Sequence, residues 1–137
     1  MEPYKNFKNK YINAKDIFNQ KENTYGVFIY WTICPHCMAI KSFMNNYLLK
    51  DNRLQIYLLN ETGEEDAILF KDIDDSNMVS KQAFMENYTK ASLGASEVKD
   101  IVYYFVPALL IIKDKKLVNY IVFEDNIEKF LRSYKDE

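Results

Sequence analysis

The motif Cys34-Pro35-His36-Cys37 constrains the fold of this chain more than any other feature. It contains both cysteines and the only histidine of the 137 residues. It follows the apolar run at residues 25–31, which is typical of a buried strand, and it begins an amphipathic helical pattern. Two thiols separated by two residues at a strand-to-helix junction form the reactive part of a dithiol/disulfide exchange site. The motif therefore predicts both a local structure and a redox chemistry.

Three non-catalytic roles for the cysteine pair fit the sequence less well. A structural disulfide would close a very short loop and would remove little entropy from the unfolded chain. A structural zinc site needs about four ligands, usually as two separated pairs, and the sequence lacks the second pair. Two incidental core cysteines would not account for a proline at the first helical position between them. We therefore expect a redox-active dithiol with no metal and no other cofactor.

The composition fits one compact domain that spans residues 1–137. Hydrophobic residues make up 48% of the chain and aromatic residues 15%, which is enough for a sizeable core. The formal net charge of −2 gives no electrostatic footprint for nucleic acid. No apolar stretch reaches the ~20 residues that a membrane span requires. The composition therefore gives no reason to expect a nucleic-acid or membrane partner, and a monomer is expected.

The first residues bear on location. Residues 1–5 lead into a polar segment rich in Lys and Asn, without the apolar region of a signal peptide. A cytoplasmic location is therefore expected, unless an export signal or anchor has been removed, in which case a location outside the cytoplasm is favoured. The frequent Lys, Asn, Ile and Tyr are typical of an AT-rich genome and indicate a bacterial source.

The apolar spacing predicts helices and strands in alternation. Strands are expected at residues 25–31, 54–59, 108–112 and 117–123, and helices at 6–22, 35–48, 78–93 and 126–134. The unbroken apolar character of residues 27–31 indicates a central strand that is covered on both faces. The short polar connection at residues 113–116 makes the last two strands an antiparallel hairpin.

Details of the helices follow from the same pattern. Gly94 is expected to end the third helix, and Asp125 or Asn126 to cap the last one. The third helix should bury the face that carries Ala83, Phe84, Tyr88 and Ala91. The last helix should bury the face that carries Ile127, Phe130, Leu131 and Tyr134. The acidic run at residues 61–66 is interpreted as a solvated loop.

The helical spacing also assigns roles to the two thiols. Cys34 takes the cap position, with Pro35 as the first helical residue, so its thiol should be exposed. Cys37 shares a core-facing stripe and should be shielded; the stripe consists of Cys37, Ile40, Met44, Tyr47 and Leu48. Cys34 is therefore the predicted nucleophile and Cys37 the resolving thiol.

The order of elements, the cysteine motif and Val106-Pro107 at the start of the third strand together resemble the thioredoxin superfamily along most of the chain. The resemblance implies an α/β fold with a central mixed β-sheet flanked by helices, and a helical insertion at about residues 60–100. It also implies that the Val106–Pro107 peptide is cis and lies against the Cys34–Cys37 disulfide. Val106, Pro107 and Trp31 are then the expected substrate-binding residues.

Within that superfamily, Cys-Pro-His-Cys with valine before the proline is most similar to DsbA-type thiol oxidases. Cytoplasmic thioredoxins typically carry Cys-Gly-Pro-Cys. The spacing from Cys37 to Pro107 is too short for the full helical domain of a DsbA protein. Phe28 stands where the superfamily usually has a buried carboxylate, so the base for Cys37 is unassigned. His36 is expected to stabilise the reduced thiolate and so to make the disulfide more oxidising.

The resemblance implies a thiol–disulfide oxidoreductase, of the exported oxidase or isomerase type, that exchanges its disulfide with protein dithiols. Its partners would be proteins with thiols or disulfides, together with a redox partner that recycles the motif. One alternative is a cytoplasmic thioredoxin-like reductase. Another is a non-catalytic interaction or redox-sensing module that docks partners through Tyr103, Tyr104 and Phe105.

Overall fold

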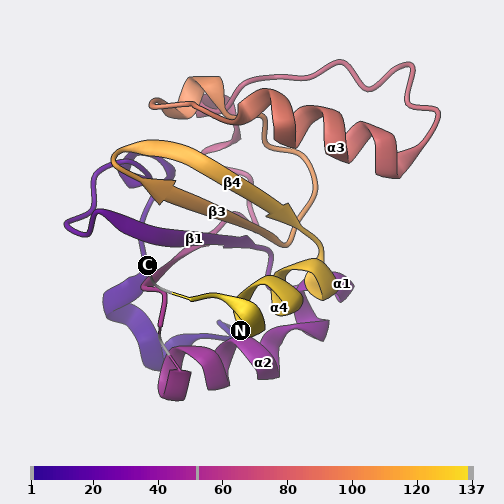
Figure 1. Cartoon of the computed structure of the whole chain (residues 1–137). Helices are drawn as coiled ribbons and strands as arrows, with labels where there is room; N and C mark the ends of the chain where they lie inside the picture. Colours follow the sequence, from indigo (N-terminus) through magenta and orange to yellow (C-terminus); the bar gives the residue numbers. More distant parts are fainter. Residues whose placement is uncertain (1, 52, 136–137) are drawn as a thin grey trace.

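The computed structural model describes residues 2–51 and 53–135 and contains a four-stranded sheet between two layers of helices (Figure 1). The strand order is β2-β1-β3-β4, with bounds β1 Thr24–Tyr30, β2 Ile56–Asn60, β3 Ala108–Lys113 and β4 Lys116–Val122. Strand β1 pairs in parallel with β2 and antiparallel with β3, and β3 forms an antiparallel hairpin with β4. The mixed sheet flanked by helices that the sequence predicts is confirmed.

Strand β1 is apolar on both faces because both faces of the sheet are covered. Helix α3 (Lys81–Ser92) lies on one side, and α1 (Pro35–Ala39), α2 (Lys41–Asn46) and α4 (Glu124–Ser133) lie on the other (Figure 1). Residues 27–29 of β1 are completely buried. The end of β1 is therefore held in place by the core, and the cysteine motif follows directly after it.

The helix that follows β1 begins as the sequence predicts and then breaks. Cys34 is the cap residue and Pro35 the first helical residue. The expected continuous helix is interrupted at Ile40, where α1 ends and α2 begins, and it finishes in the π-helical turn Tyr47–Asp51. The predicted stripe is nevertheless buried as a whole: Cys37, Ile40, Met44, Tyr47 and Leu48.

The helix expected at residues 6–22 is absent, and this prediction is wrong. The segment forms two short 3-10 helices, Lys5–Lys10 and Ala14–Asp16. Between them, Tyr11 forms a parallel bridge with Leu58, and the Ile12 amide donates to the Leu58 carbonyl at 3.0 Å. The outer edge of β2 thus accepts a backbone hydrogen bond from the Ile12 amide. In a continuous helix, that amide would have donated to a carbonyl of the same helix.

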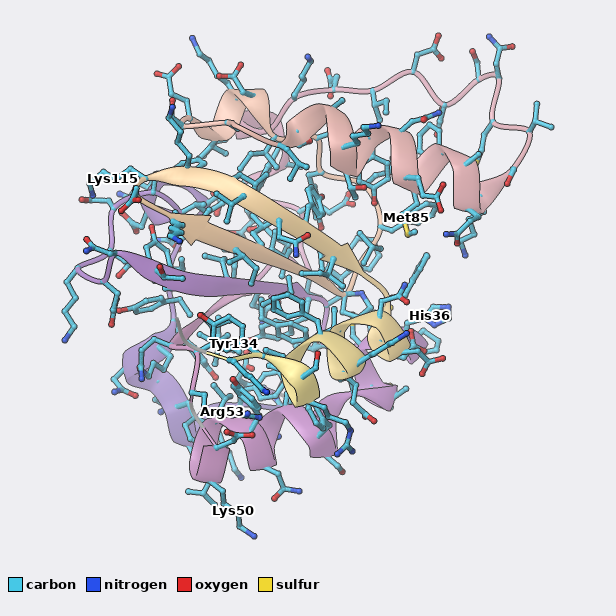
Figure 2. All side chains as sticks on the ribbon, viewed as in Figure 1. His36, Lys50, Arg53, Met85, Lys115 and Tyr134 are labelled. Atoms are coloured by element: carbon cyan, nitrogen blue, oxygen red, sulfur yellow. The ribbon has the colours of Figure 1, made fainter. Side chains whose placement is uncertain are left out.

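Helix α3 buries only part of the predicted face. Met85, Tyr88 and Ser92 are buried, whereas Ala83 and Ala91 are exposed. Met85 projects from α3 toward the sheet in Figure 2. The helix is capped by Ser80, whose hydroxyl accepts from the Ala83 amide at 3.2 Å, and Gly94 follows it with a φ of +90°. The 3-10 turns Ala67–Leu69 and Val98–Asp100 complete the chain between β2 and β3.

Helix α4 begins earlier than predicted. Its cap residue is Phe123, with a φ of 75° and no side-chain capping bond, so neither Asp125 nor Asn126 caps it. Ile127 and Leu131 are buried as expected. Glu124 consequently falls in the first turn, close to α1. No helix in the described ranges is long and apolar enough to cross a membrane.

Candidate active site

The two cysteines occupy unequal environments at the start of α1. Cys34 is partly exposed, whereas Cys37 is only 4% exposed, and both are free thiols. The backbone amide of Trp31 donates to the Cys37 sulfur at 3.3 Å. An attacking sulfur must reach its substrate, whereas a resolving sulfur need only reach its neighbour. The roles predicted for the two thiols require an inequality of this kind, and they stay predictions.

The buried thiol is strongly disfavoured as a thiolate. Burial raises the pKa of Cys37 to about 12, and the Trp31 amide opposes that rise only in part. The Cys34 thiol and the Glu124 carboxylate add to the rise. Cys37 therefore remains protonated at neutral pH, and Cys34 is the better placed sulfur to start an exchange.

The segment before β3 lies directly against the motif. The Val106–Pro107 peptide is cis, and the Cys34 thiol lies 3.9 Å from the Val106 carbonyl oxygen, to which it can donate. Val106 and Pro107 are both buried. The Trp31 indole donates to the Tyr103 hydroxyl at 2.7 Å, which ties the start of the motif to the same segment. The structure thus places Val106 beside Cys34 and Trp31 beside Cys37, while substrate binding by Val106, Pro107 and Trp31 stays a prediction.

His36 has a partner that sequence reasoning missed. Its Nδ1 lies 2.7 Å and 3.0 Å from the two carboxylate oxygens of Glu124 (Figure 2 shows His36 beside the first turn of α4). The two residues are 88 positions apart, so no local pattern could have linked them. A protonated His36 is therefore opposed by a neighbouring negative charge, which weakens the field that His36 was expected to exert on Cys34.

Pro35 starts a helix, and Tyr104 and Phe105 pack against other aromatic side chains. Pro35 is exposed at the first position of α1 and starts the helix. Tyr104 and Phe105 are half-buried and pack edge to face at 4.7 Å between ring centroids. Phe84 of α3 lies 4.9 Å from the Tyr104 ring. Part of the surface of these rings is therefore covered by contacts with α3 and with each other.

No three His, Cys, Asp or Glu side chains are grouped to hold a metal ion within residues 2–51 and 53–135. The redox pair is instead surrounded by an indole, a carbonyl, an imidazole and a carboxylate. These groups can position and polarise a sulfur, and none of them carries electrons itself.

Comparison with known proteins identifies the fold. Neither protein-family models nor curated protein sequences match the chain. Mitochondrial thioredoxin 3 from Saccharomyces cerevisiae, in its oxidised form, matches with a TM-score of 0.55 and 13% identity, covering 97% of this chain and 100% of that one. Plasmodium falciparum thioredoxin gives 0.54 and 11%, covering 92% and 99%. Chlamydomonas reinhardtii thioredoxin f2 gives 0.51 and 10%, covering 93% and 97%. The chain has a thioredoxin-like α/β fold.

Glu61 is a second residue that the sequence analysis misjudged. It belongs to the acidic run interpreted as a solvated loop, yet it is only 2% exposed at the end of β2. Its amide donates to the Tyr30 carbonyl at 2.9 Å, which draws it inward. Its Oε1 has no hydrogen-bond partner in the described part of the chain. Burial, followed by the Asp66 charge, raises the pKa of Glu61 from 4.5 to about 7.

This raised pKa predicts a specific dependence of stability on pH. The folded protein favours the protonated acid, so the stabilisation is complete below about pH 4.5 and is lost as the pH rises through about 7. At about pH 8, the free energy of unfolding of Glu61→Gln should exceed that of wild type by up to about 3 kcal/mol, because each pKa unit corresponds to ~1.36 kcal/mol. At about pH 4.5 the two proteins should be equally stable.

Urea unfolding at both pH values measures this difference. Glu64→Gln, an exposed change in the same loop, is the control and should show no pH-dependent gain. A gain for Glu61→Gln that is the same at both pH values would contradict the assignment.

Proposed function

We propose that this protein is a thiol–disulfide oxidoreductase that exchanges a Cys34–Cys37 disulfide with the thiols or disulfides of other proteins. The observation that carries the proposal is the pairing of a partly exposed Cys34 with a buried Cys37 at the start of α1. The Val106 carbonyl at 3.9 Å from Cys34 supports it, since it offers a backbone acceptor beside the reacting sulfur. The thioredoxin-like fold of the chain is also in keeping with this chemistry.

The reaction is a sequence of two sulfur displacements. The Cys34 thiolate attacks one sulfur of a substrate disulfide, forms a mixed disulfide and releases the other substrate sulfur as a thiolate. Cys37 then loses its proton and attacks the Cys34 sulfur. The second substrate thiolate leaves, and two electrons have passed from the protein to the substrate. Run in reverse, the same steps oxidise a substrate dithiol, and a recycling partner restores the starting state.

The residues around Cys34 fit an extended substrate segment. Val106 and Pro107 lead into β3 beside the Cys34 thiol, and the Trp31 amide binds the neighbouring Cys37 sulfur. Ile33 and Met38 are 76% and 60% exposed on the loop and helix that carry the motif. A protein substrate can thus meet backbone acceptors and an apolar rim at the same place.

The direction of exchange depends on how far the reduced form is stabilised. The Cys-Pro-His-Cys sequence favours an oxidase or isomerase, acting outside the cytoplasm, because a positive His36 would stabilise the Cys34 thiolate. The second candidate is a cytoplasmic reductase, which the 2.7 Å contact between His36 and Glu124 favours because it offsets that charge. A potential near −120 mV would indicate the oxidase, and one near −270 mV the reductase.

Replacing the resolving thiol should trap substrates. In Cys37→Ser, Cys34 can still form the mixed disulfide, but no second sulfur can displace the substrate. Covalent complexes with disulfide-containing proteins should therefore accumulate and disappear on reduction, as followed by non-reducing electrophoresis. Cys34→Ser is the matched control and should trap nothing. Complexes that form through Cys37 in that control would contradict the assigned roles.

Removing the partner of His36 should make the disulfide more oxidising. In Glu124→Gln, an imidazolium near the thiols is no longer opposed, so the reduced form is stabilised. The reduction potential should rise by about 10 to 30 mV, since 30 mV corresponds to about 1.4 kcal/mol. Equilibration with glutathione measures the potential.

A matched control lies on the same helix. Glu128 pairs with Arg132 at 3.1 Å on the surface of α4, so Glu128→Gln should leave the potential unchanged. His36→Ala should lower the potential more in the Glu124→Gln background than in wild type, since the pair is coupled. Equal effects of His36→Ala in both backgrounds would show that the contact does not influence the thiols.

A further inference from the structure

The resolving step needs a proton acceptor that the motif itself does not supply. Cys37 must lose its proton before it attacks Cys34, yet burial raises the pKa of this thiol to about 12. The Trp31 amide donates to the Cys37 sulfur and cannot accept its proton. No carboxylate within the described ranges forms a hydrogen bond with Cys37, and the nearby Phe28 of the core is wholly apolar. The acceptor must therefore be reached through an intermediary.

A cavity connects Cys37 with such an intermediary. Its volume is about 170 Å³, and its lining includes Tyr4, Tyr30, Thr32, Lys41 and Cys37. A water molecule needs only ~10–15 Å³ measured in this way, together with two or more polar partners. Tyr4, Tyr30, Thr32 and Lys41 each carry a polar group that can serve as such a partner. The cavity can therefore hold a chain of water molecules that begins at the Cys37 thiol.

Tyr30, which lines this cavity, also binds the carboxylate of Glu2. The Tyr30 hydroxyl donates to Glu2 Oε1 at 2.7 Å, although the Tyr30 side chain is only 1% exposed. The Tyr4 amide donates to the same oxygen at 3.1 Å, and the Asn60 side-chain amide donates to Oε2 at 2.9 Å. These three hydrogen bonds hold the Glu2 carboxylate beside the hydroxyl group of Tyr30.

Tyr4 lines the same cavity as Cys37, and its backbone amide binds the Glu2 carboxylate. Its ring packs edge to face on Tyr30 at 5.0 Å between centroids. Burial raises the pKa of Tyr4, and negative charge at Cys37 and at Glu2 adds to that rise. Tyr11 is the other titratable neighbour of Glu2, and burial followed by the Glu2 charge raises its pKa. Both phenols stay protonated at neutral pH, which leaves Glu2 as the acceptor.

Resting on the proposed function, we infer that Glu2 accepts the proton of Cys37 through cavity water and the Tyr30 hydroxyl. The Cys37 proton passes to a water molecule, that water gives a proton to the Tyr30 oxygen, and Tyr30 passes its own proton to Glu2. The Cys37 thiolate then attacks Cys34, whose bond to the substrate sulfur breaks. One proton ends on Glu2, and the same path returns it when the protein runs in the opposite direction.

Two-phase titration of the thiols with 5,5′-dithiobis-(2-nitrobenzoate) tests this route on the full chain, with any purification tag at the C-terminus. The first thionitrobenzoate is released when Cys34 attacks the reagent, and the second when Cys37 displaces it from Cys34. Glu2→Gln and Tyr30→Phe should each slow the second phase about tenfold at neutral pH and leave the first unchanged. The deficit should shrink toward about pH 9, where hydroxide replaces the relay.

The chain offers a matched control. Tyr57 donates to Glu22 at 2.7 Å in a second Tyr–Glu pair, which lies at the opposite end of β1 from the cysteines. Glu22→Gln should not slow the second phase. A second phase that is unchanged in Glu2→Gln, slowed equally at every pH, or slowed together with the first phase would overturn the inference.

The same experiment separates this inference from the proposed function. If wild type releases two equivalents and ends with a Cys34–Cys37 disulfide by mass, the redox pair works whatever Glu2 does. If wild type keeps thionitrobenzoate on Cys34 and forms no internal disulfide, the proposed function itself fails.

Discussion

The unequal burial of Cys34 and Cys37 is the constraint on which the rest of the site depends. It arises because β1 is a fully covered central strand and because α1 begins immediately beyond its end, with the cap residue outside and the third helical residue inside. Burial suppresses the Cys37 thiolate, as the rise of its pKa to about 12 shows. One sulfur is thereby exposed for attack, and the other is held for an internal displacement.

Charges around the thiols come from distant parts of the chain. Glu124 reaches His36 from α4, and Glu2 of the N-terminal segment binds Tyr30, which lines the cavity beside Cys37. One carboxylate opposes a charge near the exposed side of the motif, and the other ends a polar path on its buried side. The two therefore influence different steps: Glu124 the stability of the reduced form, and Glu2 the movement of a proton.

The sequence predicted those features that depend on local pattern. The cap at Cys34, the buried stripe through Met44, the hairpin and the core residues of α4 follow from spacing alone. Residues 6–22 were misread because the edge of β2 takes hydrogen bonds from this segment, a tertiary effect that periodicity does not contain. The partner of His36 and the burial of Glu61 were missed because each depends on contacts between segments far apart in the chain.

The most direct test of the central claim is the order in which the two thiols react. The reduced protein is treated at neutral pH with limiting iodoacetamide, and labelled peptides are quantified by mass spectrometry. Because burial raises the pKa of Cys37 to about 12 and leaves it 4% exposed, Cys34 should be labelled first and nearly alone. Equal labelling, or labelling of Cys37 before Cys34, would contradict the assigned roles of the two thiols.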